Sequence, residues 1–286
     1  MFGCHLPISP DVFDNASQIG ANVIQIMNDR NAYKTLKASR ERNPSIGLFI
    51  HATYPINITK TLQPWHIPQM CTDLNFCDSL NGTGVVIHPG SGEFKPKEIA
   101  SNLMKIATGT RHYKSKIIIE GQASCGQLIV TRVNHMVALW QELLSLNASF
   151  TKERFAFCLD TCHLCVGKSP IERNDLYKEF KQFEKEIGSQ HLALIHFNDA
   201  KVLTADRHED LFLGYIGNRR LGGNPLNLIS VAAWAVDNKV PLVIERHKNS
   251  LKNLSLQIST MREILRYGPS ALDNLLLKYY DDIKSI

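Results

Sequence analysis

The stretch FCLDTCHLC, which starts at residue 157, holds three cysteines, one aspartate and one histidine in nine positions. Such a density of ligand-type side chains is typical of a metal or redox centre. In one interpretation, Cys158, Cys162 and Cys165 form a zinc knuckle or a disulfide switch. In the other, Asp160 and His163 are the ligands and the cysteines only fill space. The choice depends on the elements that position these residues.

Short apolar runs recur along the chain and are separated by longer segments of helical character. Each run has four to six residues and is rich in Val, Ile, Leu and Phe, which is typical of strands buried on both faces of a sheet. The runs are residues 2–6, 22–27, 46–50, 84–87, 116–120, 154–159, 192–197 and 241–245. The expected helices, with apolar residues three and four positions apart, include 94–109, 127–146, 171–187 and 252–267. This alternation predicts a single (β/α)8 TIM barrel over residues 1–286, with a doubly wound open sheet as the alternative.

Histidine and carboxylate residues stand at or next to the ends of six of these runs. They are His51, His88, Glu120, Asp160, His196 and Glu245. In a closed barrel the carboxyl ends of the strands surround one bowl, so these groups point toward a common centre. Because side chains alternate along a strand, the residues two places earlier fill the barrel interior below the bowl. These are Phe49, Val86, Ile118, Cys158, Leu194 and Val243.

Three further candidates, His163, Asp206 and His208, bring the number of possible metal ligands to nine. Imidazoles mixed with carboxylates suit zinc, manganese or iron better than calcium or magnesium. A single zinc ion takes about four ligands, so nine ligands with bridging carboxylates suit a cluster of two or three ions. Closely spaced ions stabilise the attacking and leaving oxygens of phosphoryl transfer. The residues alone therefore predict a multinuclear metal hydrolase acting on a phosphate ester.

The same geometry bears on the three cysteines. Strand alternation points Cys158 into the packed interior, where a cysteine behaves as a small hydrophobe. Asp160 reaches the bowl, and His163 follows three residues later. Cys162 and Cys165 belong to the turn and the next segment, where no other cysteine completes a four-sulfur site. We therefore expect Asp160 and His163 to bind metal and the cysteines to take no part.

Composition and charge narrow the class of protein. With 286 residues, 44% of them hydrophobic, the chain can bury a large core. A net charge of +5 permits a polyanionic partner without requiring one. Seven irregularly spaced cysteines, no signal peptide and no long apolar run predict an intracellular, reducing location in the cytoplasm or nucleus and no membrane partner.

Five short motifs give the chain a resemblance to a known family. They are HATYPIN (51–57), VIHPGS (86–91), CLDTCH (158–163), HFNDAK (196–201) and DRHE (206–209). Together and in this order they resemble the endonuclease IV family of apurinic/apyrimidinic (AP) endonucleases over essentially the whole chain. The resemblance implies a (β/α)8 barrel with three zinc ions that acts in base excision repair. Such an enzyme, here expected to be a monomer, cleaves double-stranded DNA on the 5′ side of an abasic site and leaves a 3′-hydroxyl.

The resemblance also implies how the nine ligands divide among the ions. His51 and His88 would bind the first zinc and share Glu120 with the second. Asp160, His196 and Glu245 would complete the second site. The third ion would be held by His163, Asp206 and His208. A metal-bridging hydroxide near Glu245 would attack the phosphorus in line, and the third zinc would stabilise the departing 3′-oxygen.

Other residues are implied in DNA contacts or in support of the ligands. Tyr54 would enter the duplex near the flipped abasic nucleotide, or else would only cap the barrel rim. Arg30 would contact the duplex, and Asp199 would orient a metal ligand from behind. Arg219 and Arg220, in GNRRLGG, either contact phosphates or form a solvated basic turn.

Two rival functions remain at this stage. A sugar isomerase or epimerase on the same type of barrel needs fewer ligands, so His163 and the DRH motif would have no role. A catalytically inactive DNA-binding relative would have lost ligands, and all nine are present. The chain also departs from the family pattern at Phe212, where the family usually has glycine.

Overall fold

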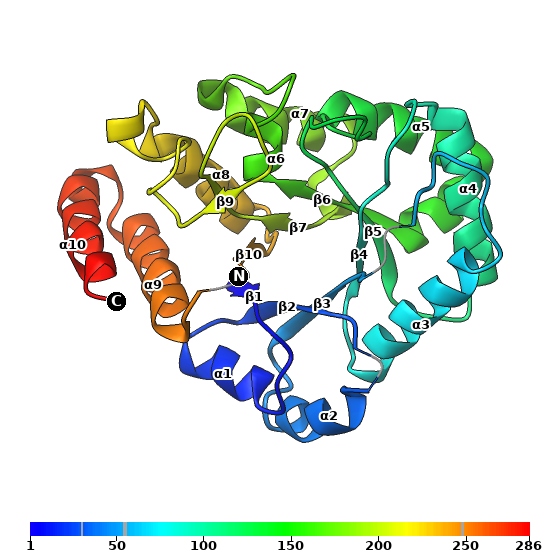
Figure 1. Ribbon diagram of the computed structural model, residues 1–286, viewed down its shortest axis with the longest axis horizontal. Coiled ribbons are helices and arrows are strands. Elements are labelled where there is room, and N and C mark those ends of the chain that lie inside the picture. Colours follow the sequence, from blue (N-terminus) through cyan, green and yellow to red (C-terminus); the bar gives the residue numbers. More distant parts are fainter. Residues whose placement is uncertain (30, 54–55, 247–248) are drawn as a thin grey trace.

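Parallel strands surround a single axis and hydrogen bond into a closed barrel (Figure 1). The computed structural model describes residues 1–29, 31–53, 56–246 and 249–286. Within these ranges the barrel has eight strands in the order β1-β10-β7-β6-β5-β4-β3-β2, and β1 pairs with β2 to close it. Their bounds are β1 Phe2–His5, β2 Val23–Met27, β3 Gly47–His51, β4 Gly84–Ile87, β5 Lys116–Glu120, β6 Phe155–Asp160, β7 Leu192–His196 and β10 Leu242–Ile244. The predicted (β/α)8 barrel is confirmed, and the open sheet is excluded.

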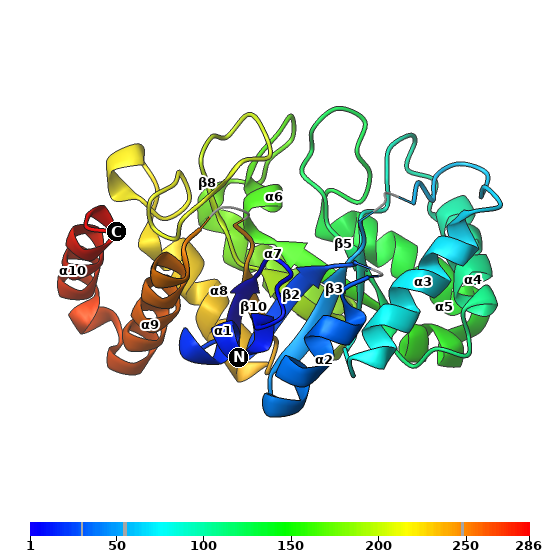
Figure 2. The same ribbon diagram turned by 60° about the horizontal axis from the view of Figure 1, so that its bottom comes forward.

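Helices cover the outside of the barrel, as Figures 1 and 2 show. They are α1 Val12–Gln18, α2 Tyr33–Arg42, α3 His66–Ser79, α4 Pro96–Gly109, α5 Val133–Arg154, α6 Thr161–Cys165, α7 Leu176–Glu186, α8 Pro225–Asp237, α9 Leu251–Tyr267 and α10 Leu272–Lys284. A short antiparallel hairpin, β8 Asp199–Ala200 and β9 His208–Glu209, follows β7. In the side view of Figure 2, long loops gather at one end of the barrel. The loops that follow the strands lie at the carboxyl end of a (β/α)8 barrel, where its active sites are built.

Helix α5 differs from the sequence-based prediction. The expected helix spanned 127–146, but α5 begins at Val133 and continues to Arg154. Residues before it form a loop that pairs with the loop after β4, where Ser91 bridges Leu128 and the Gly92 amide donates to the Gln127 carbonyl. The helical spacing of apolar residues does not distinguish a helix from a loop that packs its apolar side chains against a neighbouring loop.

The barrel interior contains a separate apolar layer. It consists of Val23, Phe49, Val86, Ile118, Ala156, Cys158, Leu194 and Val243. All six residues expected there from strand alternation are in this layer. The larger hydrophobic core lies between the strands and the surrounding helices, so the strands are buried on both faces, as their continuous apolar runs predicted.

Among residues 1–29, 31–53, 56–246 and 249–286, no helix has the length and apolar character that crossing a bilayer requires.

Phe49 tests the importance of the interior layer for stability. Its side chain is 2% exposed, so Phe49→Ala should lower the free energy of unfolding by about 3–5 kcal/mol through lost burial and a residual cavity. Leu277→Ala, on the outer face of α10 where the leucine is 60% exposed, should change it by less than about 0.5 kcal/mol. Urea unfolding followed by circular dichroism measures both. Equal losses in the two variants would contradict a packed interior layer.

Candidate metal centre

The mouth of the barrel brings the nine predicted ligands together. Six of the residues are in barrel strands or directly follow one: His51, Glu120, Asp160 and His196 end β3, β5, β6 and β7, His88 follows β4, and Glu245 follows β10. His208 comes from β9 and Asp206 from the loop before it. His163 lies in α6, and Asp160 caps the first amides of this helix. Asp160 Oδ1 accepts hydrogen bonds from the Cys162 amide at 2.6 Å and from the His163 amide at 3.0 Å.

The first group of ligand atoms contains His51, His88 and Glu120. Glu120 Oε2 lies 3.2 Å from His51 Nε2 and 3.0 Å from His88 Nε2. The two imidazole rings meet edge to face, with centroids 5.1 Å apart. Glu120 is fully buried, so its charge depends on these partners.

The second group contains Glu120, Asp160, His196 and Glu245, all of them buried. His196 Nδ1 is at the centre: it lies 3.0 Å from Glu120 Oε1, 3.3 Å from Glu245 Oε2 and 3.9 Å from Asp160 Oδ2. Glu120 therefore belongs to both groups, with one oxygen facing each.

The third group contains His163, Asp206 and His208. The two oxygens of Asp206 divide between the imidazoles, with His163 Nε2 3.2 Å from Oδ2 and His208 Nε2 3.4 Å from Oδ1. His208 Nε2 also lies 3.4 Å from Asp160 Oδ2. This nitrogen is buried and has no hydrogen-bond partner among the described residues. A buried, unpaired nitrogen that faces two carboxylates is suited to a cation between them.

Most of the histidines have their second ring nitrogen occupied by a carbonyl oxygen. His51 Nδ1 lies 3.1 Å from the Ala52 carbonyl, His163 Nδ1 2.8 Å from the Gly121 carbonyl, and His208 Nδ1 2.9 Å from the Glu245 carbonyl. An N–H that donates to a carbonyl leaves the other nitrogen with a lone pair that points into the cluster. Metal-ligating histidines are generally oriented in this way.

The pKa shifts in the cluster reflect its concentration of negative charge. Burial alone would raise the pKa of Glu120, but His196 and His88 hold it well below its usual value. Burial is likewise outweighed at Glu245, whose pKa His196 lowers to about 2. Burial would lower the pKa of His163, but Asp160 and Asp206 raise it well above its usual value.

This donor set fits divalent transition metals. Four carboxylates drawn this closely around five imidazoles favour positive charge between them, which protons or metal ions can supply. Imidazole nitrogens and carboxylate oxygens are ligands for zinc. The three groups coincide with the three ligand sets implied by the family resemblance, and Glu120 bridges two of them.

The three cysteines of FCLDTCHLC are all buried and unbridged. Cys158 lies in the barrel interior. Burial raises the pKa of Cys162 well above the usual value and that of Cys165 in the same direction, which favours the neutral thiol, a poorer metal ligand than the thiolate. Cys162 Sγ nevertheless lies within 4.8 Å of ligand atoms of Asp160 and His208.

Three residues that the sequence analysis did not select also support the cluster: Gln25, His5 and Asn198. Gln25 Nε2 donates to Glu245 Oε1 at 3.1 Å, and Gln25 Oε1 lies 2.9 Å from His196 Nε2. His5 Nδ1 lies 3.7 Å from Glu245 Oε1. Gln25 follows the interior residue Val23 by two positions, the same spacing that identified the strand-end ligands. Applying that rule to the middle of the run 22–27, as well as to the run ends, finds it.

Asn198, the third of these residues, links two ligands. Its Nδ2 donates to Asp160 Oδ2 at 2.8 Å, and its Oδ1 accepts from the Glu245 amide at 2.8 Å. The role expected of Asp199, orienting a ligand, is thus performed by its neighbour. The described hydrogen bonds of Asp199 instead come from the amides of Ala200, Ile216 and Gly217.

Asp199 is in the wrong place to orient a ligand because it holds a loop. A Cβ added at Gly214 would lie 2.5 Å from Asp199 Oδ1, so the backbone can wrap the carboxylate only with glycine there. Phe212, in the same loop, has φ of +65°. Glycine adopts this left-handed conformation without strain, which agrees with the glycine that the family usually has at this position.

None of the predicted DNA-contacting residues is found among the described residues of the cluster. Arg30 and Tyr54 lie outside the described residues. Arg219 and Arg220 are exposed in the short 3-10 helix Arg219–Leu221, and Arg219 pairs with Asp273 of α10 at 2.8 Å. These arginines thus line a surface formed with α10 and do not join the metal ligands.

Comparison with known proteins agrees with this fold. Residues 13–221 match the family described as xylose isomerase-like TIM barrel. The chain belongs to this family. Over 222 residues it is 29% identical to a putative endonuclease 4 of Acanthamoeba polyphaga mimivirus. This match covers 69% of this chain and 65% of the viral protein. Over 263 residues it is 27% identical to apurinic-apyrimidinic endonuclease 1 of Schizosaccharomyces pombe, covering 86% of this chain and 71% of the yeast protein.

Solved structures show the same barrel. Endonuclease IV from Thermus thermophilus superposes with a TM-score of 0.71 at 19% identity, covering 93% of this chain and 99% of that one. A D-tagatose 3-epimerase-like protein reaches 0.67 at 15% identity, covering 93% and 98%. The resemblance drawn from the five motifs is confirmed by the relatives named endonuclease 4. The chain spans about 65% of the length of the mimivirus relative and of a phytoplasma relative of the same name.

The cysteines and the proposed ligands can be separated by metal content. We expect Cys162→Ser and Cys165→Ser to retain the full metal complement, because neutral buried thiols contribute no ligand. Asp160→Asn and His163→Ala should each lose bound metal. Elemental analysis of the four purified variants measures this. Metal lost from the cysteine variants but kept without Asp160 and His163 would reverse the assignment.

Asn198→Ala should weaken metal binding about 10- to 100-fold, because Asp160 and Glu245 lose the amide that fixes their positions. Competition with a chromophoric chelator measures the affinity. Asn238→Ala is the matched control, since Asn238 bonds only the Trp234 carbonyl among the described residues. An unchanged affinity in Asn198→Ala would show that the two ligands hold their positions without it.

Proposed function

We propose that this protein is a zinc-dependent DNA repair endonuclease that cleaves the phosphodiester on the 5′ side of abasic sites in double-stranded DNA and leaves a 3′-hydroxyl. The observation that carries the proposal is the bridging position of Glu120, whose two oxygens face two different ligand groups. Neighbouring groups that share a carboxylate suit closely spaced ions, the arrangement used for phosphodiester cleavage. The names of the relatives, endonuclease 4 and apurinic-apyrimidinic endonuclease 1, support the same substrate.

The three ligand groups would hold three zinc ions. His51, His88 and Glu120 would hold one; Glu120, Asp160, His196 and Glu245 a second; and His163, Asp206 and His208 a third. When bound, zinc would act as a Lewis acid on the phosphate and lower the pKa of a nearby water.

Glu245 is the residue best placed to orient the attacking water. It lines the pocket beside Asp206 and His208, and Gln25 holds its Oε1. With a pKa of about 2 it stays ionised at neutral pH and accepts a hydrogen bond from the water. Glu120, also held ionised, contacts His51, His88 and His196 and thereby fixes the positions of these imidazoles.

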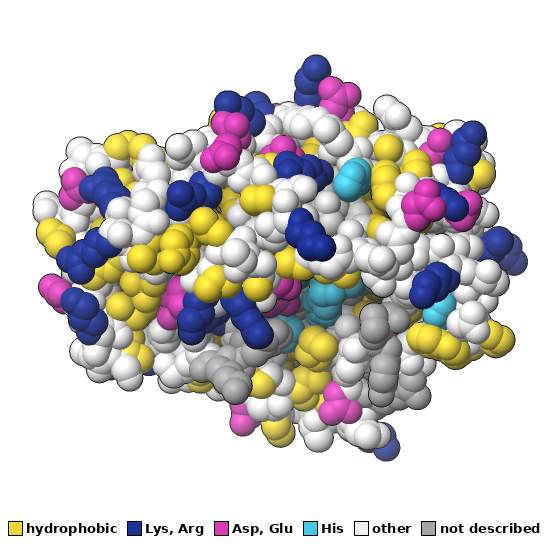
Figure 3. Space-filling model, turned by 45° about the horizontal axis from the view of Figure 1, so that its top comes forward, with side chains coloured by type: hydrophobic (Ala, Val, Ile, Leu, Met, Phe, Trp, Pro, Cys, Tyr) yellow, Lys and Arg dark blue, Asp and Glu magenta, His cyan; other side chains and the backbone are white. Residues whose placement is uncertain are grey.

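Cationic side chains beside the cluster suit the DNA backbone. A pocket of about 620 Å³ next to Asp206, His208 and Glu245 is also lined by Lys201, Arg207 and Arg246. Figure 3 shows Lys and Arg side chains beside the histidines and carboxylates of this face. Arg246 is paired with Glu209 and Asp210, whereas Lys201 and Arg207 are exposed and suited to phosphate contacts.

The alternative function is sugar isomerisation or epimerisation, because epimerase-like structures share the fold. The third ligand group argues against it. His163, Asp206 and His208 form a set separate from the first two, and a one- or two-metal sugar enzyme has no use for it. An inactive DNA-binding relative is disfavoured because every expected ligand lies in a group.

Further properties belong to the same proposal. We expect the chain to act as a monomer and a single domain, in a reducing intracellular compartment, with no membrane partner.

Glu245→Gln should keep the fold and reduce incision by orders of magnitude, because the neutral amide no longer accepts a hydrogen bond from the attacking water as a carboxylate does. The assay uses a duplex with one abasic analogue, and gel electrophoresis reports strand cleavage. Glu98→Gln, at an exposed position in α4, is the control and should cleave normally. Full activity of Glu245→Gln would refute its assigned role.

Removal of metal should also abolish incision. Prolonged chelation should inactivate the protein, and zinc should restore it while magnesium should not, because the donors are rich in imidazole. Full activity in magnesium after chelation would contradict the zinc proposal. Epimerisation of a ketohexose without DNA cleavage would favour the alternative function.

A further inference from the structure

The third ligand group depends on a segment that is not part of the barrel. His208 lies in β9, and Asp206 lies in the loop before it. β9 pairs with β8 through two residue pairs, in a two-stranded sheet separate from the closed barrel. Because so short a hairpin is marginally stable by itself, other contacts must hold these two ligands in place.

Hydrogen bonds in both directions connect His208 with the segment after β10. His208 Nδ1 lies 2.9 Å from the Glu245 carbonyl, and Arg246 Nη1 donates back to the His208 carbonyl. The same guanidinium reaches two carboxylates that follow: Nη2 lies 3.0 Å from Glu209 Oε1, and Nε lies 3.1 Å from Asp210 Oδ1. Arg246 therefore uses three nitrogens to hold three consecutive residues, the first of which is a proposed ligand.

Asp210 forms the second part of this link. It is 7% exposed, and side-chain amides donate to it in addition to the guanidinium. Oδ1 accepts from Asn249 Nδ2 at 2.6 Å and from Gln257 Nε2 at 3.1 Å, and Oδ2 accepts from Asn253 Nδ2 at 3.0 Å. Asn253 and Gln257 belong to α9. Asp210 thus anchors the end of β9 both to the segment after β10 and to a helix that covers the barrel.

The chemistry of these contacts makes the link specific. A buried carboxylate stays ionised without a large desolvation penalty only when donors replace its water, and side-chain donors surround Asp210. The three bonds of Arg246 require the planar fork of a guanidinium, which a lysine does not provide. The position of β9 therefore depends on the identity of both residues and not only on their charge.

We infer that Arg246 and Asp210 are positioning residues for the third metal ion, although neither is a ligand. They hold His208 beside the second ligand group, where its Nε2 lies 3.4 Å from Asp160 Oδ2. The inference rests on the proposed three-zinc endonuclease. Groups that orient metal ligands typically contribute 10- to 100-fold in metal affinity, so loss of the link should empty the third site before the other two.

Zinc affinity tests this inference. Wild-type protein and Asp210→Asn are loaded with zinc and titrated with a chromophoric chelator. The new amide N–H group would face donors, so one of the three zinc ions should bind about 10- to 100-fold more weakly than in the wild type. The other two should be unchanged. Wild-type affinity for all three ions in Asp210→Asn would overturn the inference.

A double variant shows which ion responds. His208→Ala removes a ligand of the third group and should release the third ion. Adding Asp210→Asn to His208→Ala should then cause no further loss of zinc, because the two changes act on the same ion. A further loss from the double variant would assign the effect to another ion and overturn the inference.

Asp14→Asn is the matched control for general destabilisation. Asp14 accepts hydrogen bonds from Arg42, Asn43 and Ser39, much as Asp210 accepts from an arginine and amides. It connects α1 to α2, on the outside of the barrel. This variant should unfold at a lower urea concentration and keep all three zinc affinities. A loss of zinc affinity equal to that of Asp210→Asn would attribute both losses to destabilisation and overturn the inference.

Arg246→Lys separates geometry from charge. The lysine keeps the positive charge but cannot bond three consecutive residues at once. Its loss of zinc affinity should therefore approach that of Arg246→Ala. Wild-type affinity in Arg246→Lys would overturn the positioning role of the guanidinium.

Zinc binding and DNA cleavage are separable outcomes. If the third zinc of Asp210→Asn is lost, excess zinc should refill the site and restore incision of the abasic duplex. If zinc affinity falls as expected but neither the wild type nor the variant cleaves DNA, the positioning role stands and the proposed activity fails. If both proteins cleave DNA and hold zinc equally, the positioning role is wrong and the endonuclease proposal stands.

Discussion

The buried carboxylate of Glu120 is the interaction on which the site depends. Taking an ionised carboxylate out of water costs several kcal/mol unless partners replace its hydration. Here the replacement is complete: Oε2 faces His51 and His88, and Oε1 faces His196 at 3.0 Å and His163 Nδ1 at 3.3 Å. Four imidazoles from different elements must therefore converge on one side chain. A shift of β3 or β7 would remove one of these partners from a buried charge, so the position of Glu120 ties the cluster to the barrel.

The barrel can hold these imidazoles around Glu120 because its interior is packed directly below the cluster. Ile118 and Leu194, two residues before Glu120 and His196, lie in the interior layer. Neighbouring strands are also in register at the mouth, where Asp160 pairs with His196. The rigid layer fixes the strand ends, and hydrogen bonds from Gln25 and Asn198 then fix the side chains. The positions of the ligand side chains are thus fixed by apolar packing below them and by hydrogen bonds from amide groups beside them.

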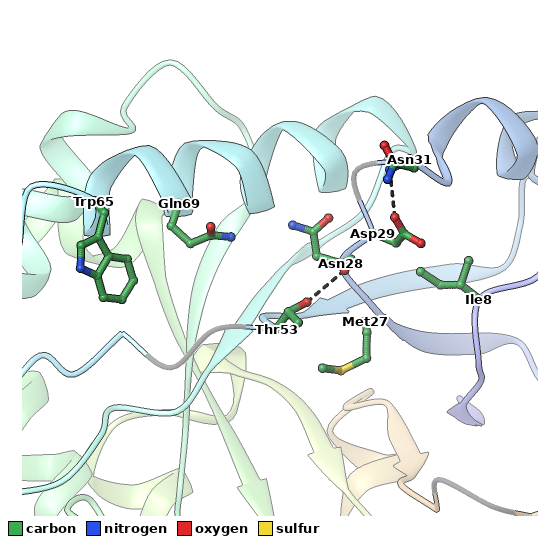
Figure 4. A pocket seen from close by; sticks show the side chains of 8 residues that line it. All are labelled: Ile8, Met27, Asn28, Asp29, Asn31, Thr53, Trp65 and Gln69. Carbon is green, nitrogen blue, oxygen red and sulfur yellow. Dashed lines mark hydrogen bonds between the residues drawn. The ribbon is translucent and has the colours of Figure 1, made fainter.

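The loops around the cluster divide the face into regions of different chemistry. Beside Asp206 and His208 the surface carries Lys201 and Arg207, which suit an anion. Beside His51 the described lining of a second pocket contains Trp65, amides and Asp29 (Figure 4).

The sequence by itself determined the strands and which of their residues face the interior or the mouth. Alternation along a strand is a local property, so Phe49 and His51, or Ile118 and Glu120, are assigned to the interior and the mouth from spacing alone. The continuous apolar runs in the same way predicted strands buried on both faces. These inferences succeed because period and burial are encoded within a few neighbouring residues.

The tertiary structure decided which polar groups meet. Asn198 and Asp199 are adjacent in sequence and similar in chemistry, yet one bonds Asp160 and the other holds the loop at Gly214. Gln25 reaches Glu245, 220 residues away, because closure of the barrel brings β2 near β10. The loop before α5 is likewise paired with a distant segment, through a bridge between Ser91 and Leu128. Hydrogen bonds between distant segments depend on how the ring of strands closes, and no local pattern records that closure.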